Sequence, residues 1–359
     1  MSTLSTASSP SDTPDSAHSP RWQTLVAPYR GGDTKRSLWQ LVSTLAGFGG
    51  LVATMLWTST FSLPLTLLLA LPAGGFAVRI FIIQHDCGHG SFFRSQRAND
   101  LVGTFCGVLM LTPYYEWRRS HAIHHAGAGN LARRGIGDIY TMTVNEYLAL
   151  GFWRRLQYRL FRNPFVLFLL GPLFVFLLIH RIPGMLTHDK GSLKERLNVH
   201  FTTLAGSALI ATGLLLVGPS TFFLVFGLPA FLGSAAGIWL FYVQHQYENA
   251  YWRPTEAWSY EDAGLLGSSY YRLPRVLQYF SGNIGFHHVH HMAPKVPNYR
   301  LQRCHEENAY FQQAVTLSLW ESLKTIGLKL YDEESNRMVG FGALRGREPR
   351  AGGEPRLAS

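Results

Sequence analysis

The hydropathy pattern of the chain is dominated by four apolar runs that carry almost no charge. A transmembrane helix needs about 20 apolar residues, and runs of this kind cover residues 38–58, 61–83, 201–217 and 221–244. Arg79 is the one charged residue inside them, and it lies near a span end, where its side chain can reach the interface. Very short turns at 59–60 and 218–220 join the runs in pairs. The pattern therefore predicts an all-α integral membrane protein with two transmembrane helical hairpins.

A fifth apolar run, over 164–180, is shorter and contains Gly171 and Pro172 at its middle. Basic residues flank it on both sides, so a crossing would place one basic loop outside, against the positive-inside tendency. The two hairpin turns carry no charge, as outer loops should. We therefore predict that 164–180 is re-entrant or interfacial; the alternative is a fifth true span.

The two ends of the chain are polar. Residues 1–37 are rich in Ser, Thr and Pro and predict a disordered N-terminal tail. They lack the apolar core of a secretory signal. Residues 332–359 predict a polar C-terminal tail, which leaves 38–331 as the membrane domain.

Composition supports this division. Charged residues make up 15% of the 359 positions, against roughly 25% in soluble domains. The net charge of +10 fits either a nucleic acid or an anionic membrane face, and the apolar runs favour the membrane over nucleic acid. Three cysteines exclude a disulfide scaffold.

Histidines gather in three clusters, HDCGH at 85–89, HAIHH at 121–125 and HHVHH at 287–291. Residues three and four positions apart share one face of a helix, so most histidines of each cluster point the same way. His288 is rotated about 100° from its neighbours' face, and we set it apart. His245 directly follows the fourth run. The candidate ligands are His85, His89, His121, His124, His125, His245, His287, His290 and His291.

The order of the spans places all nine candidates on one side of the membrane. Neutral imidazole suits Zn, Cu, Fe and Ni, so the ligands alone do not name the metal. A single zinc takes three or four protein ligands, and nine imidazoles therefore suit two ions. The His-Glu-x-x-His pattern of zinc proteases is missing, as are the Glu-x-x-His pairs of soluble di-iron bundles.

The three clusters resemble the HxxxH, HxxHH and HxxHH boxes of the membrane fatty acid desaturases. The stretches around them look most like acyl-lipid desaturases of the omega-6 (delta-12) kind. The resemblance implies a cytoplasmic helical cap holding a non-haem di-iron centre, with the nine histidines as iron ligands. It also implies that O2 and two electrons remove two hydrogens from neighbouring methylenes of an acyl chain. The acyl-CoA branch has Asn four residues before its His245 equivalent; Phe241 stands there in this chain.

Ligating imidazoles usually donate their second N–H to a carboxylate or carbonyl, and Asp86, Asp138 and Asn283 are the nearby polar candidates. Aromatic residues are candidates for the lining of a substrate channel: Tyr114, Tyr115, Trp117, Trp239 and Phe241.

Electrons must come from a separate protein, such as a ferredoxin or a b-type cytochrome. The chain has no Rossmann glycine fingerprint and no fused haem signature, and its cysteines are too few for an iron–sulfur cluster. Candidate docking residues are Arg94, Arg97, Arg118, Arg119, Arg133 and Arg134. Two other functions stay open: an acyl hydroxylase or carotenoid-modifying oxygenase of the same superfamily, and a metal-binding membrane protein without catalysis.

Overall fold

The computed structural model describes residues 21–347 and contains four helices long and apolar enough to cross a membrane. They are α2 (Thr34–Thr58), α3 (Leu63–His89), α9 (Leu193–Val217) and a continuous run from Pro219 to His245. The last comprises α10 (Pro219–Phe222), a π-helical turn (Phe223–Gly227) and α11 (Leu228–His245). The predicted all-α fold with two helical hairpins is confirmed, and each of the four helices extends beyond its predicted apolar run at one end or both.

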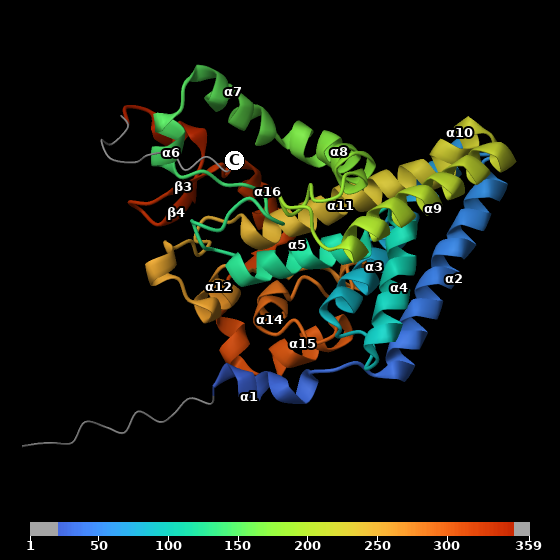
Figure 1. Cartoon of the computed structure of the whole chain (residues 1–359), viewed down its shortest axis with the longest axis horizontal. Helices are drawn as coiled ribbons and strands as arrows, with labels where there is room; N and C mark the ends of the chain where they lie inside the picture. The colour runs from blue at the N-terminus through green and yellow to red at the C-terminus, as the bar shows by residue number, and fades with distance from the viewer. Residues whose placement is uncertain (1–20, 348–359) are drawn as a thin grey trace, which may run out of the picture.

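The helices pair as two hairpins whose turns lie at the same end of the molecule (Figure 1). Polar caps begin these helices: the side chains of Asp33, Ser62 and Ser192 each accept a backbone N–H of the first turn. Gly218, with φ of 77°, makes the tight turn between α9 and α10. The opposite ends of the spans meet a cap of short helices, which include α12 (Tyr260–Leu266), α14 (His287–Met292) and α15 (Asn298–Glu306).

Helices α3 and α11 cross closely because glycines face each other there. A Cβ on Gly233 would stand 2.8 Å from the Cβ of Ala77 and 2.9 Å from the carbonyl oxygen of Gly74. Small residues at such a crossing let two membrane helices pack backbone against backbone. This crossing fixes the distance between the two hairpins.

Replacing Gly233 by Leu is expected to destabilise the protein by about 1–3 kcal/mol, the usual cost of overpacking. Gly237 is the matched control, because a Cβ there meets nothing within 4 Å. Thermal unfolding in detergent should show a lower midpoint for Gly233→Leu and an unchanged one for Gly237→Leu. Equal midpoints for the two variants would contradict a tight α3–α11 crossing.

The fifth apolar run forms the second member of a bent pair of helical segments along one edge of the molecule (Figure 1). Helix α7 (Phe152–Phe161) meets the segment Val166–Arg181 at 60°. That segment contains a π-helical turn (Val166–Leu170), α8 (Gly171–Leu177) and a 3-10 turn (Ile179–Arg181). Pro164 lies at the break and disfavours helical geometry in the residue before it. A bent pair fits either a broken span or a re-entrant segment, so the placement of 164–180 stays a prediction.

The rest of the cap is built from short elements. Its other helices are α4 (Gln96–Leu109), α5 (Tyr114–Gly127), α6 (Val144–Ala149), α13 (Arg275–Phe280) and α16 (Leu319–Lys324). Strand β1 (Tyr270–Arg272) pairs in parallel with β2 (Thr316–Ser318), Tyr270 opposite Thr316. Strand β3 (Leu330–Asp332) pairs antiparallel with β4 (Arg337–Val339). Single 3-10 turns cover Ala27–Tyr29, Thr255–Ala257, Ala309–Gln313, Thr325–Gly327 and Phe341–Leu344.

The predicted tails are wrong over their inner parts. Residues 21–37 include α1 (Trp22–Val26) and the start of α2, and Val26 is fully buried in the same core as Met292. Residues 332–347 complete the β3–β4 hairpin, where the buried Asp332 carboxylate accepts hydrogen bonds from Ser335 and Arg347. In each of these two segments, a few apolar side chains within a polar stretch are enough to pack the segment against the rest of the protein. The outer parts, 1–20 and 348–359, lie outside the described residues.

Candidate metal centre

Four helices carry the nine histidines to one region of the cap. Helix α3 ends with His85 and His89 and stops at Gly90, which takes the left-handed conformation. Helix α5 carries the second cluster, α14 the third, and α11 ends at His245. Because each cluster lies within a helix, its ring nitrogens project in directions fixed by the backbone.

Five of the histidines form a first group: His85, His89, His121, His125 and His290. One nitrogen from each ring lies within 4.8 Å of the others. The Nε2 atom of His290 stands 3.0 Å from Nε2 of both His85 and His125, and His121 and His125 approach to 3.1 Å. Their rings therefore converge on a common point.

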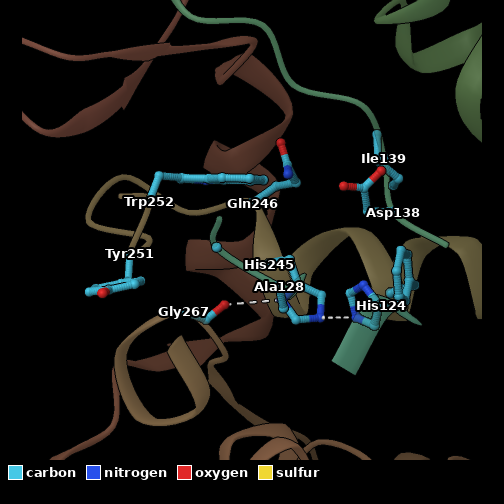
Figure 2. A pocket seen from close by; sticks show the side chains of 11 residues that line it. His124, Ala128, Asp138, Ile139, His245, Gln246, Tyr251, Trp252 and Gly267 are labelled. Atoms are coloured by element: carbon cyan, nitrogen blue, oxygen red, sulfur yellow. Dashed lines mark hydrogen bonds between the residues drawn. The ribbon is translucent and has the colours of Figure 1, made fainter. Parts of the chain in front are cut away.

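The other four, His124, His245, His287 and His291, form a second group with the same spacing. The Nε2 atom of His245 lies 3.2 Å from that of His124 and 3.0 Å from that of His287. Figure 2 shows His124 and His245 facing each other across this contact. The Nδ1 atom of His245 faces the carbonyl oxygen of Gly267 at 3.0 Å, which fixes the ring orientation.

The second cluster gives two histidines to the first group and one to the second, and the third cluster gives one to the first group and two to the second. In the second cluster His121 and His125 join the first group and His124 the second. In the third, His287 and His291 join the second group and His290 the first. Residues i and i+4 lie nearly in line along a helix, while i+3 is rotated to the other side, which explains how one short helix serves both groups.

The donor set fits two metal ions. Among the described residues, His89 Nε2 and His291 Nε2 are buried and have no hydrogen-bond partner, although a buried polar atom normally has one. Burial, and then the neighbouring imidazoles, hold the pKa values of the second and third clusters' ligands well below the usual range. These rings are therefore neutral at pH 7, as a metal ligand must be.

The nine histidines are thus the nine that the spacing selected. His288 joins neither group: its Nε2 lies 2.9 Å from Nδ1 of His305, on the far side of α14 from the centre. The prediction that sets His288 apart agrees with this position.

Residues 60–321 match the family model described as fatty acid desaturase. The chain is 47% identical over 322 residues to a "Fatty acid desaturase" of Bacillus subtilis, an alignment covering 89% of this chain and 90% of that protein. The chain belongs to the fatty acid desaturase family. It is therefore an oxidoreductase, and its four apolar helices associate it with a membrane.

Two more distant relatives carry more specific names. An "sn-1 oleoyl-lipid 12-desaturase" of Synechocystis is 28% identical over 283 residues, 74% of this chain and 75% of its own length. An "sn-2 acyl-lipid omega-3 desaturase (ferredoxin), chloroplastic" of Arabidopsis thaliana is 29% identical over 236 residues, 62% of this chain and 50% of its own length. The family is thus shown, while these relatives differ in the position they act on.

Three polar residues are predicted to support the ligands of this desaturase, and Asp86 is the one that contacts a histidine of the two groups directly. Its Oδ1 lies 3.1 Å from Nδ1 of His85, and its Oδ2 accepts from the backbone and side-chain amides of Asn298 at 2.7 and 2.8 Å. Asn283 instead donates its amide to the carbonyl of Asn298 at 3.1 Å and has φ of 58°. The expectation for Asn283 is wrong because residues 281–285 form turns and Phe286 bridges to Tyr270, so no helical turn leads into the third cluster.

Asp138 lies in the wall of a cavity beside the second group (Figure 2). The cavity is lined by His124, His245, Phe241, Tyr251, Trp252 and five other residues besides Asp138. The Asp138 carboxylate accepts the backbone N–H of Gly135 at 2.9 Å, and no hydrogen bond joins it to a histidine in the described chain. Burial raises its pKa to about 6.

Asp138→Asn is expected to stabilise the desaturase at pH 7.5 by on the order of 1 kcal/mol, a modest figure because the side chain is partly exposed. A carboxyl whose pKa is raised by folding binds more protons in the native state, so its penalty acts above pH 6 and fades as the pH falls. Unfolding midpoints of both proteins, measured from pH 7.5 to 5, should therefore converge on acidification. A constant difference across that range would contradict the raised pKa.

Arg162 and Gln246 support the second group, and no pattern in the sequence indicates this role. Arg162, at the end of α7, is fully buried and donates to the side-chain oxygen of Gln246 at 2.8 Å and to the carbonyl of Leu328 at 3.1 Å. Gln246 directly follows His245, so the buried guanidinium holds the end of α11 in place. Arg162 reads in the sequence as one more basic flanking residue.

The candidate channel aromatics separate into two sets. The Trp117 ring stacks on His121 with centroids 4.6 Å apart, and Phe241 packs against His124 and His245 at 5.1 and 5.4 Å. These two rings shield the ligands from water. Tyr114, Tyr115 and Trp239 pack elsewhere: Tyr114 donates to the carbonyl of Cys87, Tyr115 packs on Tyr114, and Trp239 packs against Phe168.

Two of the candidate docking arginines form ion pairs with carboxylates of the same chain. Arg134 forms an ion pair with Glu146 at 2.6 Å, with 8% of its side chain exposed. Arg119 pairs with Asp189 and Glu195 at 2.7 and 2.9 Å. These ion pairs hold loops of the cap in place. Arg134 is buried and does not face a partner, whereas a docking role for the partly exposed Arg119 stays a prediction.

Proposed function

We propose that this desaturase introduces a double bond into the acyl chain of a membrane lipid, using O2 and two electrons at a di-iron centre. The observation that carries the proposal is the convergence of nine buried or nearly buried imidazoles into two adjacent groups. Imidazole is a good iron ligand, and neutral ligands leave the full positive charge of two ions in the site. Two irons, when bound, supply the activation of O2 that removal of hydrogen from an unactivated methylene requires.

The residues of the chain have distinct tasks in this reaction. The first group of five histidines would hold one iron and the second group of four the other. Asp86 and Gly267 orient His85 and His245 through their second ring nitrogens. Trp117 and Phe241 cover the rings and keep water from the reacting oxygen. The second group has four histidines where the first has five, and a small cavity lies beside it.

We place the histidine-bearing cap on the cytoplasmic side. The two hairpin turns carry no charge, while basic residues concentrate on the cap side of the spans. The reaction draws its electrons from a separate protein, and one relative is named as ferredoxin-dependent.

We assign the omega-6 (delta-12) position and a lipid-linked acyl chain. The sequence around the three clusters resembles that type, and Phe241 stands where the acyl-CoA branch has Asn. The Synechocystis relative is named for the twelfth carbon of an oleoyl lipid.

Expression in a host rich in monounsaturated lipid tests the proposal. Gas chromatography of the fatty acids should show a new dienoic acid with its second double bond at carbon 12, and His124→Ala should abolish it. A hydroxy acid would overturn desaturation as the outcome, and a double bond at another carbon would overturn the position alone. A purified protein that contains zinc alone and forms no product under any reductant would overturn the enzyme.

A further inference from the structure

One histidine of the first group is partly exposed, although its Nε2 atom is buried. Seven of the nine histidines are buried, among them the other four members of this group. His89 keeps partial exposure because α3 ends there, at Gly90. Electron tunnelling weakens steeply with distance, so a surface next to His89 offers a short path to the first group.

Two cations lie beside the end of α3, where His89 is located. The Nζ of Lys295 donates to the carbonyl oxygen of His89 at 2.6 Å, and the rest of the Lys295 side chain faces solvent. Arg118 lies beside the preceding turn, since a Cβ on Gly88 would be 3.8 Å from its Cγ. Arg118 and Lys295 thus both lie beside the end of α3.

The positive surface continues from Lys295 through contacts with the N-terminal segment. The carbonyl of Lys295 accepts the N–H of Gly31 at 3.0 Å. The carbonyls of Gly31 and Gly32 accept from Arg300 and Arg94 at 3.1 and 3.3 Å. We call Arg94, Arg118, Lys295 and Arg300 the His89 patch.

Carboxylates offset the charge of the patch only in part. Asp100 is shared between Arg118, at 3.2 Å, and Lys194, at 3.7 Å. Asp33 caps the first turn of α2, and the exposed Lys35 and Arg36 add further positive charge beside it. The cavity beside the second group, by contrast, is lined by Asp138 and aromatic rings and by no Lys or Arg. The two metal groups are thus approached through surfaces of different charge.

We propose that the His89 patch docks an acidic one-electron carrier protein and that electrons enter the first group through His89. The inference rests on the proposed function. Desaturation takes two hydrogens from neighbouring methylenes and reduces one O2 to two waters, which consumes two further electrons and two protons. Each docked carrier is oxidised by one electron, so the patch must bind and release two carriers for each double bond. A surface of exposed, rim-type charges suits such short-lived encounters, because it speeds association more than it slows release.

Binding of an oxidised plant-type [2Fe–2S] ferredoxin to the iron-loaded enzyme tests the patch directly. The enzyme is held in phosphatidylcholine nanodiscs at low ionic strength, where surface charges are least screened. Lys295→Glu and Arg94→Glu are each expected to raise the Kd about tenfold, and the difference should shrink at 0.5 M salt. Arg154→Glu is the matched control: Arg154 is exposed on α7, which Figure 1 places at the opposite edge of the molecule from α15. Equal Kd values for ferredoxin in the three variants would contradict docking at the His89 patch.

A second readout separates docking from chemistry. For each variant, the rate supported by reduced ferredoxin is divided by the rate supported by reduced methyl viologen, a small cation that needs no acidic docking face. The ratio should fall about tenfold for Lys295→Glu and Arg94→Glu and stay constant for Arg154→Glu. A constant ratio in all three would overturn the docking proposal alone. Absence of any desaturated product with viologen in the unaltered enzyme would instead overturn the proposed function.

Discussion

Replacing His290 by Ala is expected to lower desaturation by more than a hundredfold and the iron content from about two ions per chain to one or fewer. His290 is the histidine of α14 that belongs to the first group, and its Nε2 lies 3.0 Å from Nε2 of both His85 and His125. Loss of a residue that only hydrogen-bonds to a metal ligand already lowers metal affinity or activity by about 10–100-fold. Removal of a ligand at the centre of its group should therefore lower both by more.

Metal analysis and product formation, measured on the same preparation, check this expectation. His200→Ala is the control, because His200 lies exposed on α9 and belongs to neither group. It should retain both ions and full activity. Retention of two irons and of the unaltered rate in His290→Ala would show that His290 is not a ligand.

Asp86→Ala is expected to weaken metal binding by about 10–100-fold and to destabilise the protein as well. The carboxylate is 1% exposed and serves His85 and Asn298 together. Its loss leaves the two amide donors of Asn298 buried without an acceptor, at about 1–3 kcal/mol for each unsatisfied group. Asn298 itself accepts from Gln40 at 3.1 Å, so the disturbance reaches α2.

A metal-competition titration, paired with thermal unfolding of the metal-free protein, resolves the two effects. Asp86→Asn keeps one acceptor oxygen and should lose less of both quantities than Asp86→Ala. Asp189→Ala removes a carboxylate from an exposed ion pair with Arg119, which is usually worth less than about 1 kcal/mol, and serves as control. Unchanged metal affinity in Asp86→Ala would remove Asp86 from the support of the centre.

The sequence predicted the apolar helices and the histidines that gather in the two groups, because both obey simple spacings. Bilayer thickness sets the length of an apolar run, and helix geometry sets which histidines share a face. Partners distant along the chain follow no such rule: Asn298 lies 212 positions from Asp86, and Arg162 lies 84 positions from Gln246. Composition also gave wrong predictions for the segments near both ends. Val26 and Met338 pack in apolar cores there, although the sequence around each of them is polar.

The opposite division of the second and third clusters between the two groups has a consequence for how the enzyme acquires its metal. Helices α5 and α14 each hold ligands of both groups, so the first ion to arrive immobilises the rings that await the second. We expect loading to be cooperative, with few chains holding a single ion. A cell short of iron would then contain a smaller number of complete enzymes beside empty ones, and its membranes would still receive correctly placed double bonds, at a lower rate.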